Sequence, residues 1–341
     1  MSSPAAANLP DVKPSPYPMP LFWALGGSLL ISATLLGLAI GRVGPGWLDQ
    51  AGAVGVATAY TIALSLRTGG RPVVFGLLAL AVGLLAVLGP HKEPFGDARV
   101  GAAVMTASVT AVLAVMITVP AVRAAVAVRE VLIAIAISAL GAVAAVGFRA
   151  EVQVERFDYA ALLVAFALGF GLVFRLGAGW HGLGRRGVLV VLAGSAALAV
   201  SIAYAEMLRR YGSTHMVDLV FDAVRWVRDT IGAVPRPMQV LVGIPALLWG
   251  CHMRARRRQG WWVCVFGCAA TASVAGTLVN PGTGWLEAAL ITAYSLVLGL
   301  AVGYALIRLD LALSGSRGSR ARQEEQLGAV RPEPSRLQPL L

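Results

Sequence analysis

The sequence predicts an all-α, polytopic integral membrane protein with about ten transmembrane helices and one outer interfacial amphipathic helix. The chain has 341 residues, of which 57% are hydrophobic and 13% charged, and its mean hydropathy is +0.75. Soluble domains are about 45–50% apolar and about 25% charged, so this chain has too little polar surface for a water-facing globule. Two further observations support the class: long apolar runs, and arginines concentrated between alternate runs.

Ten apolar runs are long enough to cross the hydrocarbon core of a bilayer, which takes roughly 17–25 residues as a helix. Within lipid a helix pairs all its backbone N–H and C=O groups internally, so we expect each run to be helical. The runs span residues 21–41, 47–66, 72–90, 100–122, 130–148, 158–175, 187–208, 237–253, 261–280 and 285–308. The second run is the weakest, because Thr58, Tyr60 and Thr61 interrupt its apolar character.

Positive charge is concentrated on one side of these runs. The N-terminal region and the connections after even-numbered runs hold 18 of the 28 Lys and Arg residues, and the other connections hold 10. Because basic loops stay preferentially in the cytoplasm, we expect a multi-pass protein with both termini in the cytoplasm. Its abundant Ala, Gly, Val and Leu, with lysine only at Lys13 and Lys92, are typical of a GC-rich bacterial genome and so predict a bacterial plasma membrane.

The connection after the seventh run carries five arginines and disagrees with this orientation. Its residues 214–231, THMVDLVFDAVRWVRDTI, alternate apolar and charged residues at helical spacing, which predicts an amphipathic helix too charged to span. We expect this helix to lie flat at the outer interface, with Trp226 at headgroup level and Gly232 just beyond its end. It would serve either as a strut between the seventh and eighth runs or as a lid or partner-docking element.

Three regions follow from this pattern. Residues 1–20 are expected to form a disordered cytoplasmic N-terminal tail, residues 21–313 a transmembrane helical domain, and residues 314–341 a disordered cytoplasmic C-terminal tail. The tails combine Pro, Gly, Ser and charged residues without apolar periodicity, so they lack the apolar surface that drives folding.

The middle of each run lacks ionisable residues, which in membranes usually mark an ion or proton pathway. Their absence argues against a pump with a midplane carboxylate but leaves neutral-solute transport through hydroxyl groups open. The fourth, ninth and tenth runs carry the hydroxyls of Thr106, Ser108, Thr110, Thr271, Ser273, Thr277, Thr292, Tyr294 and Ser295. Such groups either line a pathway or bridge packed helices. The row Ser295, Gly299 and Gly303 favours close packing.

Motifs of known chemistry are weak in this chain. GAGWHG, residues 177–182, has dinucleotide-binding spacing but follows a membrane run instead of a strand, so we regard the match as accidental. Cys264 and Cys268 share a helix face, and Cys251 and His252 can lie at a similar depth. Their spacing fits no familiar zinc site, and cysteines in apolar helices usually serve packing. We therefore predict no catalytic, cofactor-binding or metal-binding residue and no cofactor.

The outer acids Glu151, Glu155 and Asp158 could bind a cation or a substrate. Arg149 and Arg156 stand beside them, which favours an exposed loop that neutralises its own charge. An enzyme acting on a lipid substrate would use these acids.

The segment RARRRQGWW, residues 254–262, concentrates four arginines and two tryptophans between the eighth and ninth runs. No basic groove with interleaved aromatic residues extends it, so nucleic-acid binding is not expected. The arginines fit a cytoplasmic connection, where they can contact anionic lipid headgroups. Trp261 and Trp262 fit the aromatic belt at a membrane interface.

Three functions stay open at this point. The number of predicted helices and the outer amphipathic helix favour a permease-like protein for a neutral or lipid-like solute. The uncharged midplane and the small-residue packing favour a non-catalytic membrane assembly or regulatory protein, and a lipid-substrate membrane enzyme is the third alternative. A midplane cavity lined by hydroxyls would favour transport, whereas a closely packed bundle would favour assembly or regulation. The partners expected in every case are the lipid bilayer and its anionic headgroups.

Overall fold

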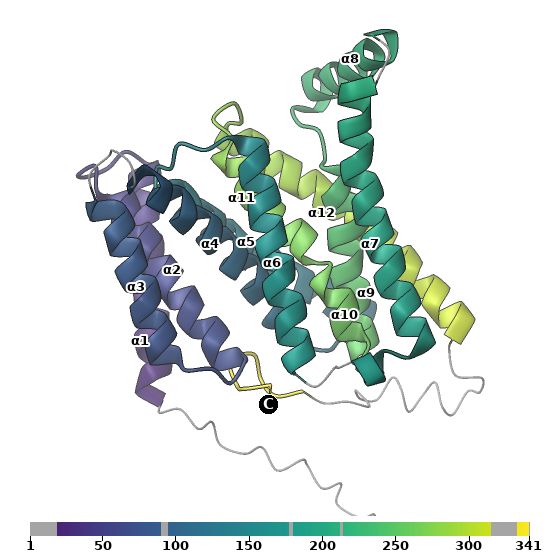
Figure 1. The fold of residues 1–341 in the computed structure, drawn as a ribbon, viewed down its shortest axis with the longest axis horizontal. Helices are drawn as coiled ribbons and strands as arrows, with labels where there is room; N and C mark the ends of the chain where they lie inside the picture. The colour runs from purple at the N-terminus through teal and green to yellow at the C-terminus, as the bar shows by residue number, and fades with distance from the viewer. Residues whose placement is uncertain (1–18, 90–94, 177–179, 212–213, 315–332, 341) are drawn as a thin grey trace, which may run out of the picture.

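The computed structural model describes residues 19–89, 95–176, 180–211, 214–314 and 333–340. Every regular element in this part of the chain is a helix, which confirms an all-α, membrane-like fold. The elements are α1 Met19–Ile40, α2 Leu48–Arg67, α3 Pro72–Leu88, α4 Phe95–Met116, α5 Ala124–Gly147, α6 Val154–Arg175, α7 Trp180–Tyr211, α8 Thr214–Ile231, the π-helix η1 Gln239–Gly243, α9 Ile244–Arg254, α10 Gly260–Val265, α11 Cys268–Val279 and α12 Trp285–Ser314. They form a bundle with α8 across one end (Figure 1).

Each predicted run overlaps one helix, or two consecutive elements in the case of the eighth and ninth runs. Within the described residues, six helical segments are long and apolar enough to cross a membrane. They are Met19–Ile40, Asp97–Met116, Ala124–Gly147, Val154–Arg175, Gly260–Val279 and Trp285–Leu313. The structure thus supports helices at all the predicted positions, but supports membrane crossing by length and apolarity for these six alone.

Three of the other four predicted crossings are shorter or more polar: α3 has 17 residues, η1 and α9 together run only from Gln239 to Arg254, and α2 is more polar. α7 has 32 residues, and the apolar stretch identified in its described part is Val191–Ala203. α2 carries polar groups that face neighbouring helices. For example, the Tyr60 hydroxyl donates to the Ile137 carbonyl of α5 at 3.1 Å. A helix surrounded by other helices can satisfy such groups without lipid contact.

Burial divides the helices into a central and a peripheral set. The central set includes the segments Gly260–Val279 and Asp97–Met116, of which 89% and 72% are buried, whereas the most apolar stretches of α1 and α12 are 17% and 22% buried. Large apolar side chains of the peripheral helices are exposed, for example Trp23, Leu78, Leu192 and Val297. Exposed leucine and valine on a peripheral helix are compatible with lipid as the surrounding solvent.

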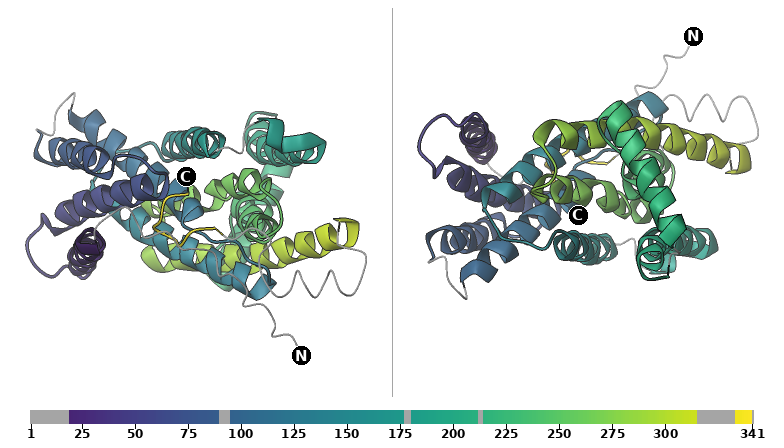
Figure 2. Two further views of the ribbon diagram at one scale, coloured as in Figure 1. Left: turned by 90° about the horizontal axis from the view of Figure 1, so that it is seen from below. Right: turned by 90° about the horizontal axis from the view of Figure 1, so that it is seen from above.

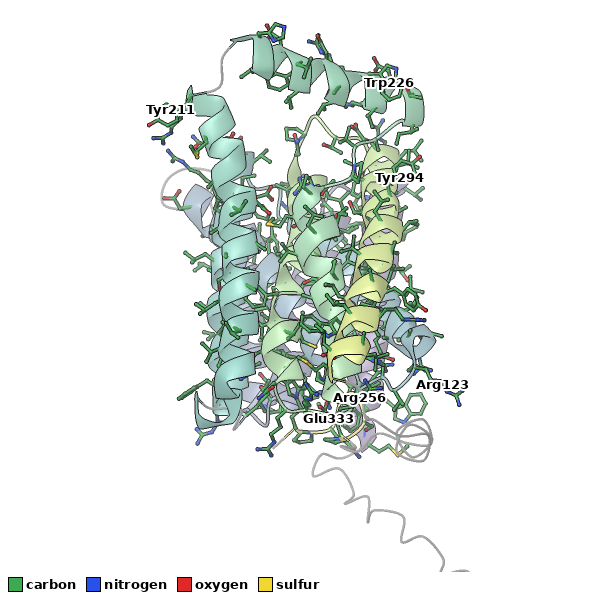
Figure 3. All side chains as sticks on the ribbon, turned by 90° about the vertical axis from the view of Figure 1, so that its right-hand side faces the viewer. Arg123, Tyr211, Trp226, Arg256, Tyr294 and Glu333 are labelled. Carbon is green, nitrogen blue, oxygen red and sulfur yellow. The ribbon has the colours of Figure 1, made fainter. Side chains whose placement is uncertain are left out.

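The bundle has two distinct ends. The connections α2–α3, α4–α5 and α9–α10 meet at one end, which we call the basic end, and α8 lies at the other, the α8 end (Figure 1). Figure 3 places Arg123, Arg256 and Glu333 at the basic end, and Trp226 and Tyr294 at the α8 end. The connections predicted to share the more positive side therefore lie together.

α8 spans the residues predicted for the amphipathic helix, Thr214–Ile231. Gly232 follows with a φ of +81°, a left-handed conformation that ends many helices and that glycine adopts without strain. Arg225 pairs with Asp222 one turn away at 2.8 Å, and Arg228 pairs with Glu287 of α12 at 2.7 Å. Neighbouring carboxylates thus compensate part of the positive charge of this connection.

Two central helices depart from regular α geometry where they touch. Pro245 stands in the first turn of α9, and because its ring would clash with the carbonyl one turn earlier, the preceding turn widens into the π-helix η1. Opposite, α10 and α11 are joined by tighter turns in which Gly267 N–H donates to the Cys264 carbonyl at 2.8 Å. A Cβ atom on Gly243 of η1 would lie 2.2 Å from the backbone nitrogen of Ala270, so the two irregular segments are in direct backbone contact.

The small-residue row of α12 packs closely, as its spacing predicts. A Cβ atom on Gly299 would lie 2.7 Å from the Cβ of Ile244, and one on Gly303 would lie 2.9 Å from a methyl group of Leu248. These glycines therefore let the backbone of α12 approach α9.

Candidate functional site

The segment Glu333–Leu340 lies across the middle of the basic end, where the view along the bundle shows its yellow trace (Figure 2, left). The Leu340 N–H donates to the Arg67 carbonyl at 3.0 Å. This differs from the disordered tail expected for residues 314–341, because the segment brings charged groups to buried partners on the bundle. α12 also continues to Ser314, and residues 315–332 lie outside the described part of the chain.

Arg67, the last residue of α2, is fully buried beneath this segment. Its Nε donates to the Met116 carbonyl at 2.9 Å. Its Nη1 faces the backbone carbonyls of Pro334, Ser335 and Gln338 at 3.3, 2.8 and 3.0 Å. Its Nη2 is buried without a hydrogen-bond partner among the described residues. A buried cation surrounded by neutral acceptors, with one amino group unpaired, is incompletely compensated.

Arg254, the last residue of α9, is 1% exposed and lies in the same cluster. Its guanidinium forms an ion pair with Glu333. It also donates to the Thr118 hydroxyl at 2.7 Å and to the Thr118 carbonyl at 2.9 Å. The guanidinium carbon lies 3.5 Å from the ring centre of Trp261, a stacking geometry that adds a cation–π attraction and holds the planar group in one orientation.

Glu130 of α5 is the buried carboxylate of the cluster, with an exposure of 0%. Arg336 donates to its two oxygens at 2.6 and 2.8 Å, the paired geometry in which arginine binds carboxylate most strongly. The Val119 N–H donates to the same carboxylate at 3.1 Å, and the largely exposed Arg129 approaches it at 3.1 Å. Glu130 therefore links the α4–α5 connection to the 333–340 segment.

The α4–α5 connection is the scaffold of this site, because side chains of four other elements bind its backbone. Besides the contacts of Met116, Thr118 and Val119, the Ile117 carbonyl accepts from Arg336 at 3.1 Å. The Ala121 carbonyl lies 3.0 Å from Nδ1 of His252. Buried backbone groups need partners, and here charged and polar side chains supply them.

The tryptophans that follow the arginine-rich segment are inside the protein. Trp261 and Trp262 are 7% and 5% exposed, and the ring of Trp262 lies 5.9 Å from that of Phe170 in α6. Their assignment to an interfacial aromatic belt is therefore wrong, because α10 packs inside the bundle. Arg254 is likewise buried, whereas Arg258 of the same segment is exposed.

The cysteines lie near this cluster. Cys251, Cys264 and Cys268 are free thiols and are all buried. A Cβ atom on Gly250 would lie 2.6 Å from Sγ of Cys264, so the ends of α9 and α10 are adjacent, as their spacing predicts. Within the described residues no group of three or more His, Cys, Asp or Glu side chains could hold a metal ion.

Several of the hydroxyls proposed for a pathway are engaged with backbone carbonyls, whereas the Thr110 hydroxyl is buried without a hydrogen-bond partner among the described residues. Ser108 of α4 donates to the Ala161 carbonyl of α6 at 3.0 Å, and Thr271 of α11 lies 3.2 Å from the Ala111 carbonyl of α4. The hydroxyls of Ser273, Thr277 and Thr292 bond back to their own helices. Most of these side chains are buried, with exposures of 5% or less for all but Thr292 and Tyr294. The geometry is that of packed helices.

The outer acids are dispersed. Asp158 of α6 pairs with Arg236, next to η1, at 3.3 Å, and the Arg236 N–H donates to the Ser295 hydroxyl at 2.9 Å. Arg149, expected to neutralise these acids, instead pairs with Asp49 of α2 at 2.5 Å. Arg149 and Asp158 therefore pair with residues of other parts of the chain instead of with each other.

The sequence did not predict the linked cluster of Arg67, Glu130, Arg254, Glu333 and Arg336. One signal was available in the sequence. Charged residues stand at the ends of apolar runs, and a C-terminal tail of mixed charge could form ion pairs with them. Glu130 and Arg336 are 206 residues apart in the sequence. At such a separation, sequence spacing does not indicate which residues are in contact.

No protein-family model matches the chain, and comparison with curated proteins and with solved structures gave no significant match.

Proposed function

We propose that this chain is a non-catalytic assembly or regulatory protein of the membrane, in which the 333–340 segment is a reversible ligand of its own bundle. One observation carries the proposal: Arg67, Arg254 and Glu130 are buried beneath a segment that is separate from the helices. A buried charge loses free energy when its ion pair is incomplete. A competing charged partner should therefore change strongly the fraction of molecules in which the segment is bound to the bundle.

The proposed topology has ten crossings, with the basic end in the cytoplasm of a bacterial plasma membrane. The sided distribution of arginine supports this orientation. The alternation of the helices supports the count, because connections of one predicted side share one end of the bundle (Figure 1). Exposed arginines at this end, such as Arg258, would face anionic headgroups.

The packing of the central helices supports regulation or assembly over transport. The hydroxyls of Ser108, Thr271 and Thr277 are engaged with carbonyls of neighbouring helices or of their own helix. A solute pathway through them would have to break these bonds, each of which contributes roughly 0.5–1.5 kcal/mol.

A permease-like function is the second candidate, and the irregular pair of central helices favours it. The π-helix η1 and the tight turn at Gly267 lie in the two segments that touch at Gly243 and Ala270. Broken helices near the middle of a bundle form substrate sites in many transporters. A lipid-substrate enzyme, the third alternative, would need the outer acids free to meet a substrate, whereas Asp158 is held in an ion pair with Arg236.

Photo-crosslinking tests the proposed function in the full chain in its own membrane. A photoreactive residue replaces Ser335, whose side chain is exposed. We expect crosslinks within the chain, and a Glu130→Gln substitution should lower them and raise adducts with a second protein. Arg129→Gln is the matched control, because Arg129 is largely exposed and its loss leaves the Glu130–Arg336 pair intact. If Glu130→Gln changes neither kind of adduct, the segment is not a reversible ligand.

Solute flux distinguishes the second candidate. Proteoliposomes are shifted into a panel of neutral solutes, from glycerol to monosaccharides, and their swelling is followed by light scattering. A regulatory protein leaves the swelling rate equal to that of protein-free liposomes. Saturable swelling that Gly243→Ala abolishes would establish the permease and overturn our proposal.

A further inference from the structure

The cluster at the basic end has an excess of positive charge that the 333–340 segment does not remove. The bundle contributes Arg67, Arg254 and Glu130, all with exposures of 1% or less. The segment adds one charge of each sign, Glu333 and Arg336. Three guanidiniums therefore face two carboxylates, and the bundle alone presents two buried cations to one anion. A site with this balance favours an anion.

The segment also fills the site imperfectly. Three carbonyls share the single Nη1 group of Arg67, while its Nη2 donates to no described residue although it is buried. A carbonyl carries only a partial charge, whereas arginine binds best to an oxyanion that accepts two parallel hydrogen bonds. Arg67 thus has an acceptor set weaker than its donors could use.

Arg254 is arranged for the same kind of ligand. Trp261 lies against the face of its guanidinium at 3.5 Å, and Thr118 accepts two of its hydrogen bonds. These contacts hold the guanidinium so that its Nε and Nη2 groups reach the carboxylate of Glu333, while Nη1 also lies 3.9 Å from Sγ of Cys264. Glu333 is the only carboxylate paired with Arg254 among the described residues, and it belongs to the segment that can leave.

We propose that Arg67 and Arg254 form a binding site for a phosphate group, and that Glu333 and the carbonyls of the segment occupy this site when phosphate is absent. The inference rests on the proposed function, because it names the competitor that releases the segment. A phosphate offers several charged oxygens, enough to accept from Arg254 in place of Glu333 and from both terminal nitrogens of Arg67. The same group could come from a phospholipid headgroup or from free phosphate.

Release of the segment is measurable by hydrogen–deuterium exchange with mass spectrometry. The full chain is placed in nanodiscs of a phosphate-free glycolipid, digalactosyldiacylglycerol, and the peptide covering residues 333–340 is followed during titration with inorganic phosphate. We expect exchange in this peptide to rise at least tenfold with phosphate, and not with sodium chloride of equal ionic strength. Equal effects of the two salts would mean simple screening and would overturn the proposal.

The source of phosphate is resolved by the lipid. Nanodiscs of phosphatidylglycerol without added phosphate release the segment if the headgroup is the ligand, and free phosphate releases it in digalactosyldiacylglycerol if the soluble anion is the ligand. Either result supports the site. A segment that stays protected in both arms overturns it while leaving the proposed function standing. A segment that exchanges freely under every condition overturns the docking itself, and with it both proposals.

Matched variants test whether Arg254 and Glu333 are responsible for the release of the segment by phosphate. Arg254→Gln should raise the phosphate concentration for half-release at least tenfold, and Arg258→Gln, at an exposed position of the same connection, should leave it unchanged. Because Arg254→Gln could unfold the chain, Glu333→Gln provides a second reading. It weakens the competitor and keeps both cations, so it should lower the half-release concentration several-fold. An unchanged value in Glu333→Gln contradicts competition at this site.

Discussion

At the scale of single residues, charge burial is the most informative feature of this protein. Arg67, Glu130 and Arg254 are fully or almost fully buried, although ionised groups lose several kcal/mol each when they leave water. Arg254 and Glu130 are compensated by charged partners of the 333–340 segment, Glu333 and Arg336, whereas Arg67 has only neutral carbonyl acceptors. The stability of this end of the bundle therefore depends on a few side chains.

Replacement of Glu130 by Gln should destabilise the protein. The change removes the charge that accepts from Arg336 at 2.6 and 2.8 Å and from the Val119 N–H at 3.1 Å. Hydrogen bonds to charged groups contribute about 1.5–3 kcal/mol each, so we expect a loss of about that size, measured by thermal unfolding in detergent. Arg129→Gln should change stability by less than about 1 kcal/mol, because Arg129 is largely exposed. Equal losses in the two variants would contradict this assignment.

At the scale of elements, the contact between η1 and α11 decides how the central helices pack. A Cβ atom on Gly243 would lie 2.2 Å from a backbone nitrogen of α11, and a backbone atom moves only with its helix. Only glycine fits this crossing without displacement. The irregular geometry of η1, caused by Pro245, fixes the place where the two helices meet.

Gly243→Ala should therefore lower stability by about 1–3 kcal/mol, the usual effect of inserting atoms into a packed core. Gly171→Ala in α6 is the matched control, because nothing lies within 4 Å of the Cβ atom it would add. We expect no loss there, since alanine favours helix relative to glycine. Thermal unfolding of both variants in the same detergent measures the difference. A Gly243→Ala protein as stable as the control would show that the helices separate easily.

The positions of the helices could be predicted from the sequence, and the site could not. Apolar runs and the amphipathic pattern of residues 214–231 are local, so their periodicity locates helices without knowledge of neighbours. The contacts of Glu130 and Arg67 with residues near 336 join segments more than 200 residues apart. Trp261 illustrates the same limit, because a tryptophan beside arginines is typical of an interface until packing against α6 buries that turn.

At the scale of the whole molecule, the proposed topology of ten crossings predicts which connections lie on the same side of the membrane. α2 is the sharpest test, because it is not among the six segments that qualify as spans by apolarity. A cysteine at Val43 should react with a membrane-impermeant maleimide in intact cells, and one at Arg71 only after permeabilisation. Both positions are exposed, and the native cysteines are buried, so background labelling should be low.

Two further positions control for orientation. A cysteine at Asp222 in α8 should label like the one at Val43, and one at Arg257 like the one at Arg71. If Val43 and Arg71 label from the same side, α2 does not cross and the count of ten is wrong. If all four cysteines label from the side opposite to the one expected, the count of ten crossings stands and the basic end faces outward.

The contacts between the 333–340 segment and the bundle have a consequence for biosynthesis. The ribosome synthesises Arg67 and Glu130 long before Glu333 and Arg336. During synthesis, the buried charges of the basic end therefore lack the partners that the 333–340 segment supplies later. The ion pair of Glu130 with Arg336, 206 residues apart, and the hydrogen bond from Arg67 to the Ser335 carbonyl, 268 residues apart, can form only after α12 has been made. A chain that stops before Glu333 would keep Arg67 and Arg254 without the acceptors that the 333–340 segment supplies to them.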